Sequence, residues 1–522
     1  MAPPPSLSTT GLAFALALST VACNAITGAD DLVIYGEGNS GSGGSTTGGP
    51  GSGPTSGSGM GSSSSGVDPT PMVGAAGVSV REVALSQGVK RPLMQNGVAS
   101  SSTIPIVFGR DAVLRVFYDV DANYNGGPIT ARLHLDGVTT LEVVTDRLFP
   151  TSIEPNLSST INFNLTADLV LGAISYRVEL LQRPSESPLD NPAAKYPTAG
   201  FDTVPVAATP ALLRIDIVPI SYGADGSNRV PDLSPAQLRR YQDYFYAMYP
   251  ATSVDVVAQQ PMAWNLAIGA NGSGWDQVLD ALASYRTQQG PDPNTYYYGV
   301  FMPSPTKDQF CGGGCVAGLG FVAAPQDSYA RAAIGLGYPE DNMDTETAVH
   351  EIGHTHGRNH SPCGGAGGPD PSFPYSDGGI GSWGYNILTR QLYDPTVFTD
   401  LMGYCVPIWI SDYTFRGLFQ RMQQLGSASV VFPPEVLDRT YDRVRVSPDG
   451  VATFLDPVTL HRPPMAETIQ VDVQTASGTQ RVAAQLYRYN HLEGGQVLWP
   501  RTQEQATSAV IEFDGKAIPA QR

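Results

Sequence analysis

The eleven residues at 350–360, HEIGHTHGRNH, limit the local fold more than any other stretch of this chain. They hold four of the seven histidines in the 522 residues. Because residues 347–355 contain no proline, we predict a helix there. On that helix His350 and His354 lie four positions apart, so they share one face about one turn from each other. This spacing lets two imidazole nitrogens reach one metal ion at roughly 2.0–2.1 Å.

The residues around this pair fit the same site. Glu351 follows the first histidine and lies beside the metal, where a carboxylate can hold a water molecule. Gly357 is predicted to end the helix with a positive φ angle and to turn the chain sharply. That turn can return His360 as a third ligand, whereas a continuing helix would carry it away. His356 is predicted to face solvent as a bystander. We expect the remaining histidines to be structural or exposed: His134, His461 and His491.

Five residues together match the motif HExxHxxGxxH, which resembles the zinc motif of the metzincin metalloproteases: His350, Glu351, His354, Gly357 and His360. A second feature is independent of the first. Metzincins carry a Met-turn that places a methionine beneath the metal, and the segment TDLMGY offers Met402. Tyr404 matches the tyrosine that astacin- and serralysin-like metzincins place near the metal. The resemblance covers residues 212–425 and not the regions on either side.

This resemblance implies one catalytic Zn²⁺ ion with an open position for water. Its ligands would be His350, His354 and His360. Zinc lowers the pKa of that water to about 7, and Glu351 acts as the general base that passes the proton to the leaving amine. Tyr404 would stabilise the oxyanion with its hydroxyl group. Met402 would do no chemistry and would supply an apolar floor beneath the ligands.

The region before the histidines alternates between strand and helix patterns. Ser234 and Pro235 mark the start of one helix, and a second is predicted at 275–286. Strands are predicted at 212–220, 254–258, 295–302, 316–323 and 332–336. We therefore predict an α+β catalytic domain over 209–427, with a mixed five-stranded sheet as in metzincins. By the resemblance, an edge strand pairs with an extended peptide substrate. The glycines of 316–323 make it the candidate, and an ordinary sheet strand is the equal alternative.

Both regions beside this domain have strand patterns. Strands are predicted at 103–108, 112–120, 129–135, 160–165 and 176–181, and later at 470–474 and 481–489. We predict an immunoglobulin-like β-sandwich over 75–208. Residues 428–522 are predicted to form a small C-terminal β domain.

The N-terminal residues predict export. Residues 1–23 form a predicted signal peptide whose apolar core, GLAFALALSTVA, is too short to span a bilayer. Cys23 follows small residues, which resembles the lipobox of bacterial lipoproteins, although Thr20 replaces the usual Leu and the start lacks Lys and Arg. An ordinary cleaved signal peptide and a misassigned start codon stay open. Residues 24–74, rich in Gly and Ser, are a predicted disordered tether. We expect a surface or outer-membrane lipoprotein, or a secreted protein.

Export makes disulfides the default for the later cysteines. These are Cys311, Cys315, Cys363 and Cys405. Four cysteines allow three pairings, and the sequence cannot choose among them. We favour Cys311–Cys315, which closes the CGGGC loop, and Cys363–Cys405, which ties the segment after the histidines to the Met-turn. A thiolate metal site is the alternative, but the spacing is not that of a zinc ribbon.

These observations favour a secreted or surface-tethered zinc endopeptidase that hydrolyses extracellular proteins or glycoproteins. The β modules beside the catalytic domain resemble the StcE-like, mucin-cleaving bacterial metalloproteases; astacin- and serralysin-like peptidases come next. The net charge of −18 argues against nucleic acid, and we expect a monomer whose only membrane contact is a lipid on Cys23. The alternative is a surface adhesin that binds glycan or protein, with a non-catalytic zinc site. Glu351 favours the enzyme, since structural zinc needs no general base.

Overall fold

The computed structural model describes residues 71–184, 189–427 and 433–522. The predicted signal peptide with Cys23, and the predicted tether up to residue 70, lie outside the described residues. The described part is mixed α+β, with several sheets and few helices, as predicted. Within these ranges no helix has both the length and the apolar character that a membrane crossing requires.

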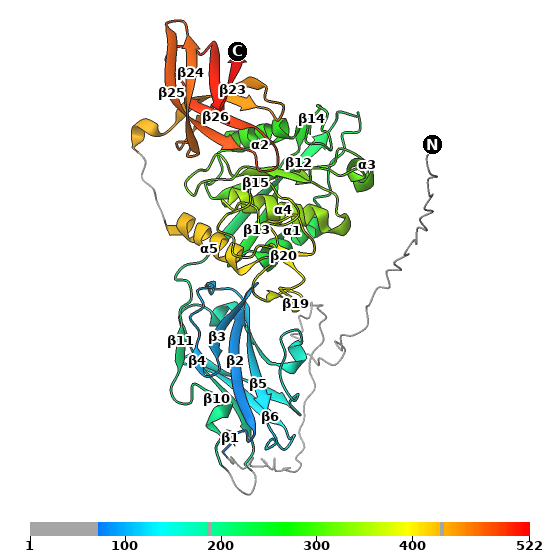
Figure 1. Cartoon of the computed structure of the whole chain (residues 1–522), viewed down its shortest axis with the longest axis vertical. Coiled ribbons are helices and arrows are strands. Elements are labelled where there is room, and N and C mark those ends of the chain that lie inside the picture. Colours follow the sequence, from blue (N-terminus) through cyan, green and yellow to red (C-terminus); the bar gives the residue numbers. More distant parts are fainter. Residues whose placement is uncertain (1–70, 185–188, 428–432) are drawn as a thin grey trace, which may run out of the picture. The chain divides into compact units, whose positions relative to one another are not determined.

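Residues 73–204 form two antiparallel sheets (Figure 1). One has the strand order β1-β9-β6-β7, with β10 and β11 also paired to β9; the other has the order β4-β3-β2-β5-β8. The strands are β1 Val73–Gly74, β2 Val78–Ser86, β3 Lys90–Gln95, β4 Val98–Ala99, β5 Ala112–Val120, β6 Ile129–Leu135, β7 Thr139–Thr145, β8 Ile161–Leu165, β9 Ile174–Gln182, β10 Lys195–Tyr196 and β11 Asp202–Val204. The two sheets share one hydrophobic core, to which Leu114 of β5 and Leu133 of β6 contribute.

The predicted strand at 103–108 is wrong, because this buried segment is irregular. Pro105 has no N–H to donate to a neighbouring strand. The Gln87 side chain takes the place of a strand partner: its Oε1 accepts from Val107 N at 2.7 Å, and its Nε2 donates to Val107 O at 3.1 Å. Burial thus explains the apolar pattern that predicted a strand.

A central mixed sheet has the order β13-β12-β15-β17-β16, with β14 beside β12. Its strands are β12 Leu212–Tyr222, β13 Ser253–Ala258, β14 Met262–Trp264, β15 Thr295–Phe301, β16 Gly318–Gly320 and β17 Ala332–Leu336. Only the β16–β17 pair is antiparallel. The five predicted strands are present, but the strand predicted at 316–323 is reduced to the three residues of β16, at the end of the sheet.

Helices cover both faces of the central sheet. Successive side chains of β15 point to opposite faces and pack against different helices. Tyr296 and Tyr298 pack in one core with α1 and α4, whereas Tyr297 packs in the other with α2. The helices are α1 Pro235–Met248, α2 Trp275–Gln289, α3 Lys307–Cys311, α4 Met343–Thr355 and α5 Asp412–Ser427. Short 3-10 turns occur at Leu157–Ser159, Ala167–Leu169, Pro192–Ala194, Glu340–Asn342 and Pro434–Val436. Ser234 caps α1 with its side chain, as predicted.

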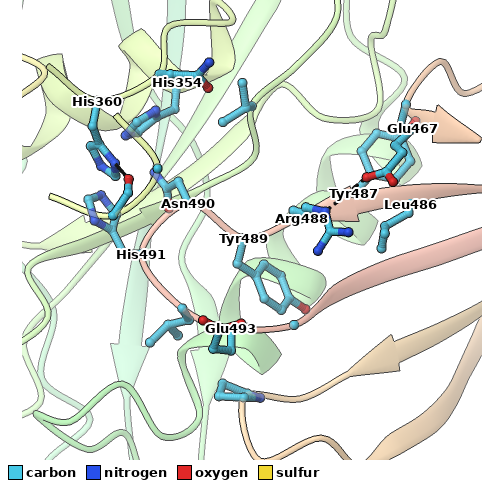
Figure 2. A pocket seen from close by; sticks show the side chains of 18 of the residues that line it. His354, His360, Glu467, Leu486, Tyr487, Arg488, Tyr489, Asn490, His491 and Glu493 are labelled. Atoms are coloured by element: carbon cyan, nitrogen blue, oxygen red, sulfur yellow. Dashed lines mark hydrogen bonds and ion pairs between the residues drawn. The ribbon is translucent and has the colours of Figure 1, made fainter. Parts of the chain in front are cut away.

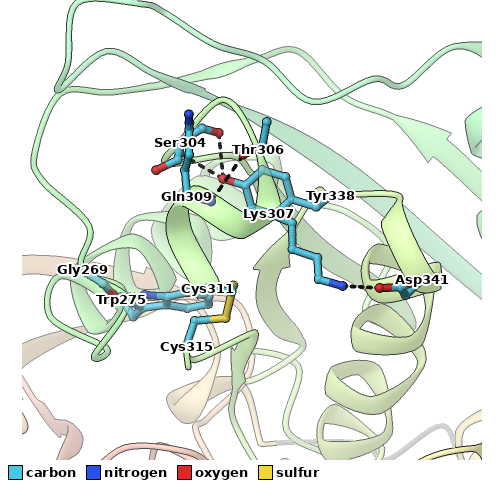
Figure 3. The surroundings of a disulfide bond; sticks show 10 residues. All are labelled: Gly269, Trp275, Ser304, Thr306, Lys307, Gln309, Cys311, Cys315, Tyr338 and Asp341. Carbon is cyan, nitrogen blue, oxygen red and sulfur yellow. Dashed lines mark hydrogen bonds and ion pairs between the residues drawn. A yellow bond between two sulfur atoms is a disulfide. The ribbon is translucent and has the colours of Figure 1, made fainter. Parts of the chain in front are cut away.

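The favoured disulfide pairing is confirmed: Cys311 bonds to Cys315, and Cys363 bonds to Cys405. The first joins the last residue of α3 to the loop that follows, and it packs against the same hydrophobic cluster as Trp275 (Figure 3). The second joins the turn after His360 to the chain that follows Met402. Between the two cysteines lie three short strands, β18 Gly384–Asn386, β19 Gln391–Tyr393 and β20 Thr399–Asp400, and β21 Ile408–Trp409 follows Cys405. Two disulfides are compatible with an extracellular protein.

Residues 439–521 form one antiparallel sheet with the order β23-β22-β26-β25-β24-β27-β28. Its strands are β22 Arg439–Val446, β23 Ala452–Leu460, β24 Glu467–Thr475, β25 Gly478–Arg488, β26 Gly495–Pro500, β27 Ser508–Phe513 and β28 Lys516–Gln521. Arg445 of β22 lies 3.2 Å from Asp276 and 3.6 Å from Asp280, both buried carboxylates of α2. The connection between β25 and β26 runs beside the central sheet: Tyr489 bridges to Phe321, and Asn490 N donates to Gly320 O of β16 at 3.3 Å.

Candidate metal and active site

Helix α4 carries the first two predicted ligands on one buried face. His350 and His354 are both buried, and their Nε2 atoms lie 3.1 Å apart. Gly353 sits beside them, where the helix meets the buried Met402. A Cβ atom at position 353 would lie 2.5 Å from Met402 Sδ, which is closer than Cβ atoms normally approach. The absence of a side chain at Gly353 therefore lets the methionine lie directly beneath this turn.

The turn after α4 brings the third predicted ligand back. The helix ends at Thr355, and Gly357 has a φ angle of +78°, as predicted. Its N–H donates to His354 O at 2.7 Å, which satisfies a carbonyl at the helix end. The ring centroid of His360 then lies 4.6 Å from that of His354 and 5.5 Å from that of His350. The structure thus brings the three predicted histidines together.

Each of these three rings donates its Nδ1 hydrogen to a backbone carbonyl. The acceptors are Leu401 O, 2.7 Å from His350; Arg358 O, 2.6 Å from His354; and Gly367 O, 2.5 Å from His360. A carbonyl oxygen can only accept, so Nδ1 must carry the hydrogen and Nε2 must carry a lone pair. Metal-binding histidines are usually oriented in this way.

The three Nε2 lone pairs fit a small divalent cation. His350 and His354 present theirs to each other at 3.1 Å, where neither can donate, and His360 Nε2 is buried without a hydrogen-bond partner among the described residues. Around a tetrahedral zinc ion with bonds of roughly 2.0–2.1 Å, two ligand nitrogens lie about 3.3 Å apart. Burial lowers the pKa of His350 to about 3 and lowers the pKa of the other two, so all three rings are neutral at pH 7. Neutral imidazole is the form that binds metal.

Glu351 is buried against β16, and two glycines of that strand make room for it. A Cβ atom at Gly318 would lie 2.3 Å from Glu351 Oε1, and one at Gly320 would lie 3.2 Å from Oε2. Asn490 Nδ2 donates to Oε2 at 2.7 Å, and His491 Nε2 lies 2.8 Å from Oε1. Burial raises the pKa of Glu351, but His491 and Asn490 outweigh it and the pKa falls below its ordinary value. The side chain is therefore a carboxylate at neutral pH.

Tyr404 lies at the rim of the histidine cluster and is 43% exposed. Its ring centroid is 5.1 Å from that of His360, and its hydroxyl group hydrogen-bonds to His491 Nδ1. Burial and the charge of Glu351 raise the pKa of Tyr404, so its hydroxyl group keeps its proton and can donate. The Cys363–Cys405 disulfide adjoins it, and Tyr404 N donates to Cys363 O at 3.2 Å. The disulfide thus fixes the chain that carries this hydroxyl.

The expectation that His491 is a bystander is wrong. Its ring, on the connection between β25 and β26, lies 4.8 Å from that of His360, 5.2 Å from His350 and 5.5 Å from His354 between centroids. One ring nitrogen from each of the four histidines lies within 4.8 Å of the others. Figure 2 shows His491 beside His354 and His360. Sequence reasoning missed both His491 and Asn490, because no spacing relates them to a motif more than 120 residues earlier.

The prediction that His356 faces solvent is also wrong. Its ring is buried, stacks on Tyr296 of β15 with centroids 4.1 Å apart, and has Nδ1 2.8 Å from Ile352 O. The helix ends one residue earlier, so this ring turns toward the sheet instead of continuing the exposed face. His356 is therefore a core residue. His134 pairs with Glu179, and the exposed His461 pairs with Asp438, outside the site.

Two cavities flank the histidine cluster. One, of about 930 Å³, extends past His354 and His360 toward the β25–β26 connection (Figure 2). The other, of about 530 Å³, lies over His350 and Glu351 and reaches the Cys315–Gly318 segment. Tyr404 and His491 line both. These two side chains therefore stand between the cavities.

No protein-family model matches the sequence, and no curated protein matches it. A solved structure described as a chaperone-substrate complex matches with a TM-score of 0.22 and 10% identity, over 51% of this chain and 39% of that one. This protein thus spans less than half of that chain. The crystal structure of metalloproteinase-II from Bacteroides fragilis matches with a TM-score of 0.20 and 14% identity, over 48% of this chain and 73% of that one. At such TM-scores neither likeness carries an argument about this protein.

Proposed function

We propose that this protein is a zinc-dependent endopeptidase of the metzincin type, acting on extracellular proteins or glycoproteins. One observation carries the proposal: three buried, neutral histidines direct their Nε2 lone pairs at one another beside a buried carboxylate. His350, His354 and His360 would hold the ion. When bound, zinc supplies a Lewis acid and lowers the pKa of a coordinated water to about 7. Three imidazoles suit zinc among the divalent metals.

The protein's own groups would supply the remaining chemistry. Glu351 is ionised and buried, so it can take a proton from the attacking water and deliver it to the leaving amine. Tyr404 keeps its hydroxyl proton and can donate a hydrogen bond to a developing oxyanion. Met402 packs beneath α4 and holds the helix that carries two of the ligands. A structural zinc site would need neither the carboxylate nor the hydroxyl.

A peptide substrate suits the surroundings of the cluster. β16 ends the central sheet, and its outer edge already pairs with an extended segment: Phe321 forms an antiparallel bridge with Tyr489, and Asn490 N donates to Gly320 O at 3.3 Å. An edge that accepts one extended chain can accept another. The cavities on both sides of the cluster would receive residues on either side of the scissile bond. These features support an endopeptidase.

A second candidate is a surface binding protein with a closed, non-catalytic zinc site, because a fourth histidine lies within reach. Structural zinc sites are closed by four protein ligands, whereas catalytic sites keep one position open. The position of Glu351 favours the enzyme. The two candidates differ in whether removing that carboxylate has any measurable consequence.

The test is digestion of casein and of mucin by the zinc-loaded chain, in the wild type and in His491→Ala, each with and without Glu351→Ala. We expect Glu351→Ala to lower cleavage at least about 10²-fold and to retain one zinc per chain. His354→Ala should lose the zinc. The matched control is His461→Ala, which removes an exposed histidine paired with Asp438. It should leave both the cleavage rate and the zinc content unchanged. Equal cleavage with and without Glu351, or none in any zinc-loaded variant, would contradict the proposal.

A further inference from the structure

We propose that residues 489–492 occupy the peptide position of this active site, with His491 as a fourth ligand of the metal. This segment, here called the internal segment, joins β25 to β26. The inference rests on the proposed function, because it concerns how the same site is filled and opened. It assigns to the C-terminal sheet a direct part in the metal centre.

The internal segment pairs with β16 as an extended peptide would. Tyr489 and Phe321 form an antiparallel bridge, and Asn490 N donates to Gly320 O at 3.3 Å. Gly320 N in turn donates to Asn490 Oδ1 at 2.9 Å. Gly320, the last residue of β16, thus has its backbone donor and its backbone acceptor both engaged by one neighbouring segment. A substrate strand would need the same two backbone groups.

Beyond this pairing, His491 lies where a ligand of the metal must lie. Its ring centroid is 4.8–5.5 Å from those of the other three histidines. Its Nδ1 hydrogen-bonds to the Tyr404 hydroxyl; with Nδ1–H donating to that oxygen, as the other three rings donate to carbonyls, Nε2 keeps a lone pair for the metal. That Nε2 is buried and, although 2.8 Å from Glu351 Oε1, forms no aligned hydrogen bond to any described residue. His360 Nε2 is likewise buried without a hydrogen-bond partner among the described residues.

The internal segment also engages the catalytic groups. Asn490 Nδ2 donates to Glu351 Oε2 at 2.7 Å, while His491 lies against Oε1, so both carboxylate oxygens are contacted. The same histidine holds the Tyr404 hydroxyl. The base and the tyrosine hydroxyl are therefore both in contact with the internal segment. His491 and Tyr404 also line both cavities, so an extended substrate that occupied both would pass these two side chains.

Two anchors hold the internal segment in place. Tyr489 is buried, stacks on Phe321 with centroids 5.9 Å apart, and donates its hydroxyl hydrogen to Asp280 of α2 at 3.1 Å. At the other end Leu492 packs over Gly272, where an added Cβ would lie 2.5 Å from Leu492 Cδ2. The segment faces the metal with a side chain and is fixed on both sides. It is therefore a resident occupant, and substrate must displace it.

A test that does not depend on catalysis uses a fluorescent peptide hydroxamate, which binds catalytic zinc through its own oxygens. The zinc-loaded full chain is titrated with this probe as wild type, His491→Ala and the control His461→Ala. We expect His491→Ala to bind the probe at least about tenfold more tightly. The apparent affinity is proportional to the fraction of sites that are open, and removing His491 should open more of them. The control should match the wild type. Equal affinity in wild type and His491→Ala would overturn the inference.

A second measurement needs no variant. The zinc X-ray absorption spectrum of the wild type should show four imidazole ligands, and three imidazoles with one oxygen would overturn the inference. Cleavage assays separate this proposal from the previous one. If His491→Ala binds the probe more tightly yet cleaves nothing, the endopeptidase proposal fails and the fourth ligand stands. If the wild type binds the probe and cleaves substrate as well as His491→Ala does, the endopeptidase proposal stands and the fourth-ligand inference fails.

Discussion

Gly353 lies on α4 where the helix passes closely over Met402. In an ordinary helix, Ala is favoured over Gly by about 1 kcal/mol. Here the added methyl group would lie 2.5 Å from Met402 Sδ, and both residues are buried. We expect Gly353→Ala to lower the free energy of unfolding of the zinc-loaded protein by about 1–3 kcal/mol, the usual cost of overpacking.

The control for this prediction is a double-mutant cycle with Met402→Ala, followed by thermal and denaturant unfolding. Removing the methionine should relieve the overlap, so Gly353→Ala should cost less in that background. An equal cost in both backgrounds would mean that Met402 does not restrict the helix. A stabilised Gly353→Ala protein would mean that the side chain moves aside without penalty.

At the scale of single residues, the sequence correctly predicts how residues close to one another in the chain are placed. The i, i+4 histidines, the positive φ of Gly357 and the return of His360 all follow from helix geometry and from the conformational freedom of glycine. His491 could not be predicted, because its position depends on how a separate sheet docks. His356 was missed for the opposite reason: one residue past the helix end, its direction depends on the local turn rather than on the helical period.

Strand β16 shows why elements are harder to predict than motifs. The glycines at 318 and 320 predicted a place where another chain approaches closely, and two groups do so: Asn490 from outside, and Glu351 from within the site. The predicted length was wrong, because only three residues pair with β17. The irregular segment at 103–108 has a similar cause, since a buried glutamine replaces its strand partner. An apolar pattern in the sequence therefore indicates that a segment is buried. Whether that segment pairs as a strand depends on which residues from elsewhere in the chain lie beside it.

The close fit between β16 and Glu351 can be tested at one glycine. A Cβ at Gly318 would lie 2.3 Å from Glu351 Oε1, so Gly318→Ala must displace the carboxylate. We expect cleavage to fall at least about 10²-fold with zinc retained, as for loss of a general base. Gly313→Ala is the matched control in the same loop region, because a Cβ there meets no atom within 4 Å among the described residues. Comparable losses in both variants would contradict a specific effect on Glu351.

For the molecule as a whole, the described contacts link the C-terminal sheet to the metal site through α2. Asp280 accepts hydrogen bonds from Tyr489 and Gln496, and Arg445 lies 3.6 Å away. Tyr489 begins the internal segment, so this buried carboxyl supports the segment that reaches the metal. No sequence pattern relates α2 to a strand more than 150 residues later, and the docking became visible only in the fold.

This interface should make stability depend on pH. Burial raises the pKa of Asp280 from 3.8 to about 7, although Gln496, Arg445 and Arg443 oppose the shift. A carboxyl with a raised pKa in the folded state stabilises the fold below pH 3.8, and that contribution is lost as pH rises toward about 7. Asp280→Asn keeps the acceptor for Tyr489 and removes the titration. Its stability relative to wild type should therefore grow from pH 5 to pH 7, by at most about 1.4 kcal/mol per pH unit.

Thermal unfolding of both chains across pH 5–8 measures this difference. Asp472→Asn is the control, because Asp472 pairs with Arg481 on the surface and its pKa is lowered. That variant should show no gain with rising pH. If the difference between Asp280→Asn and wild type stays constant over the range, Asp280 is fully ionised and the arginines dominate. If the difference grows, the docked sheet carries a buried carboxyl whose ionisation weakens the anchor of the internal segment as pH rises.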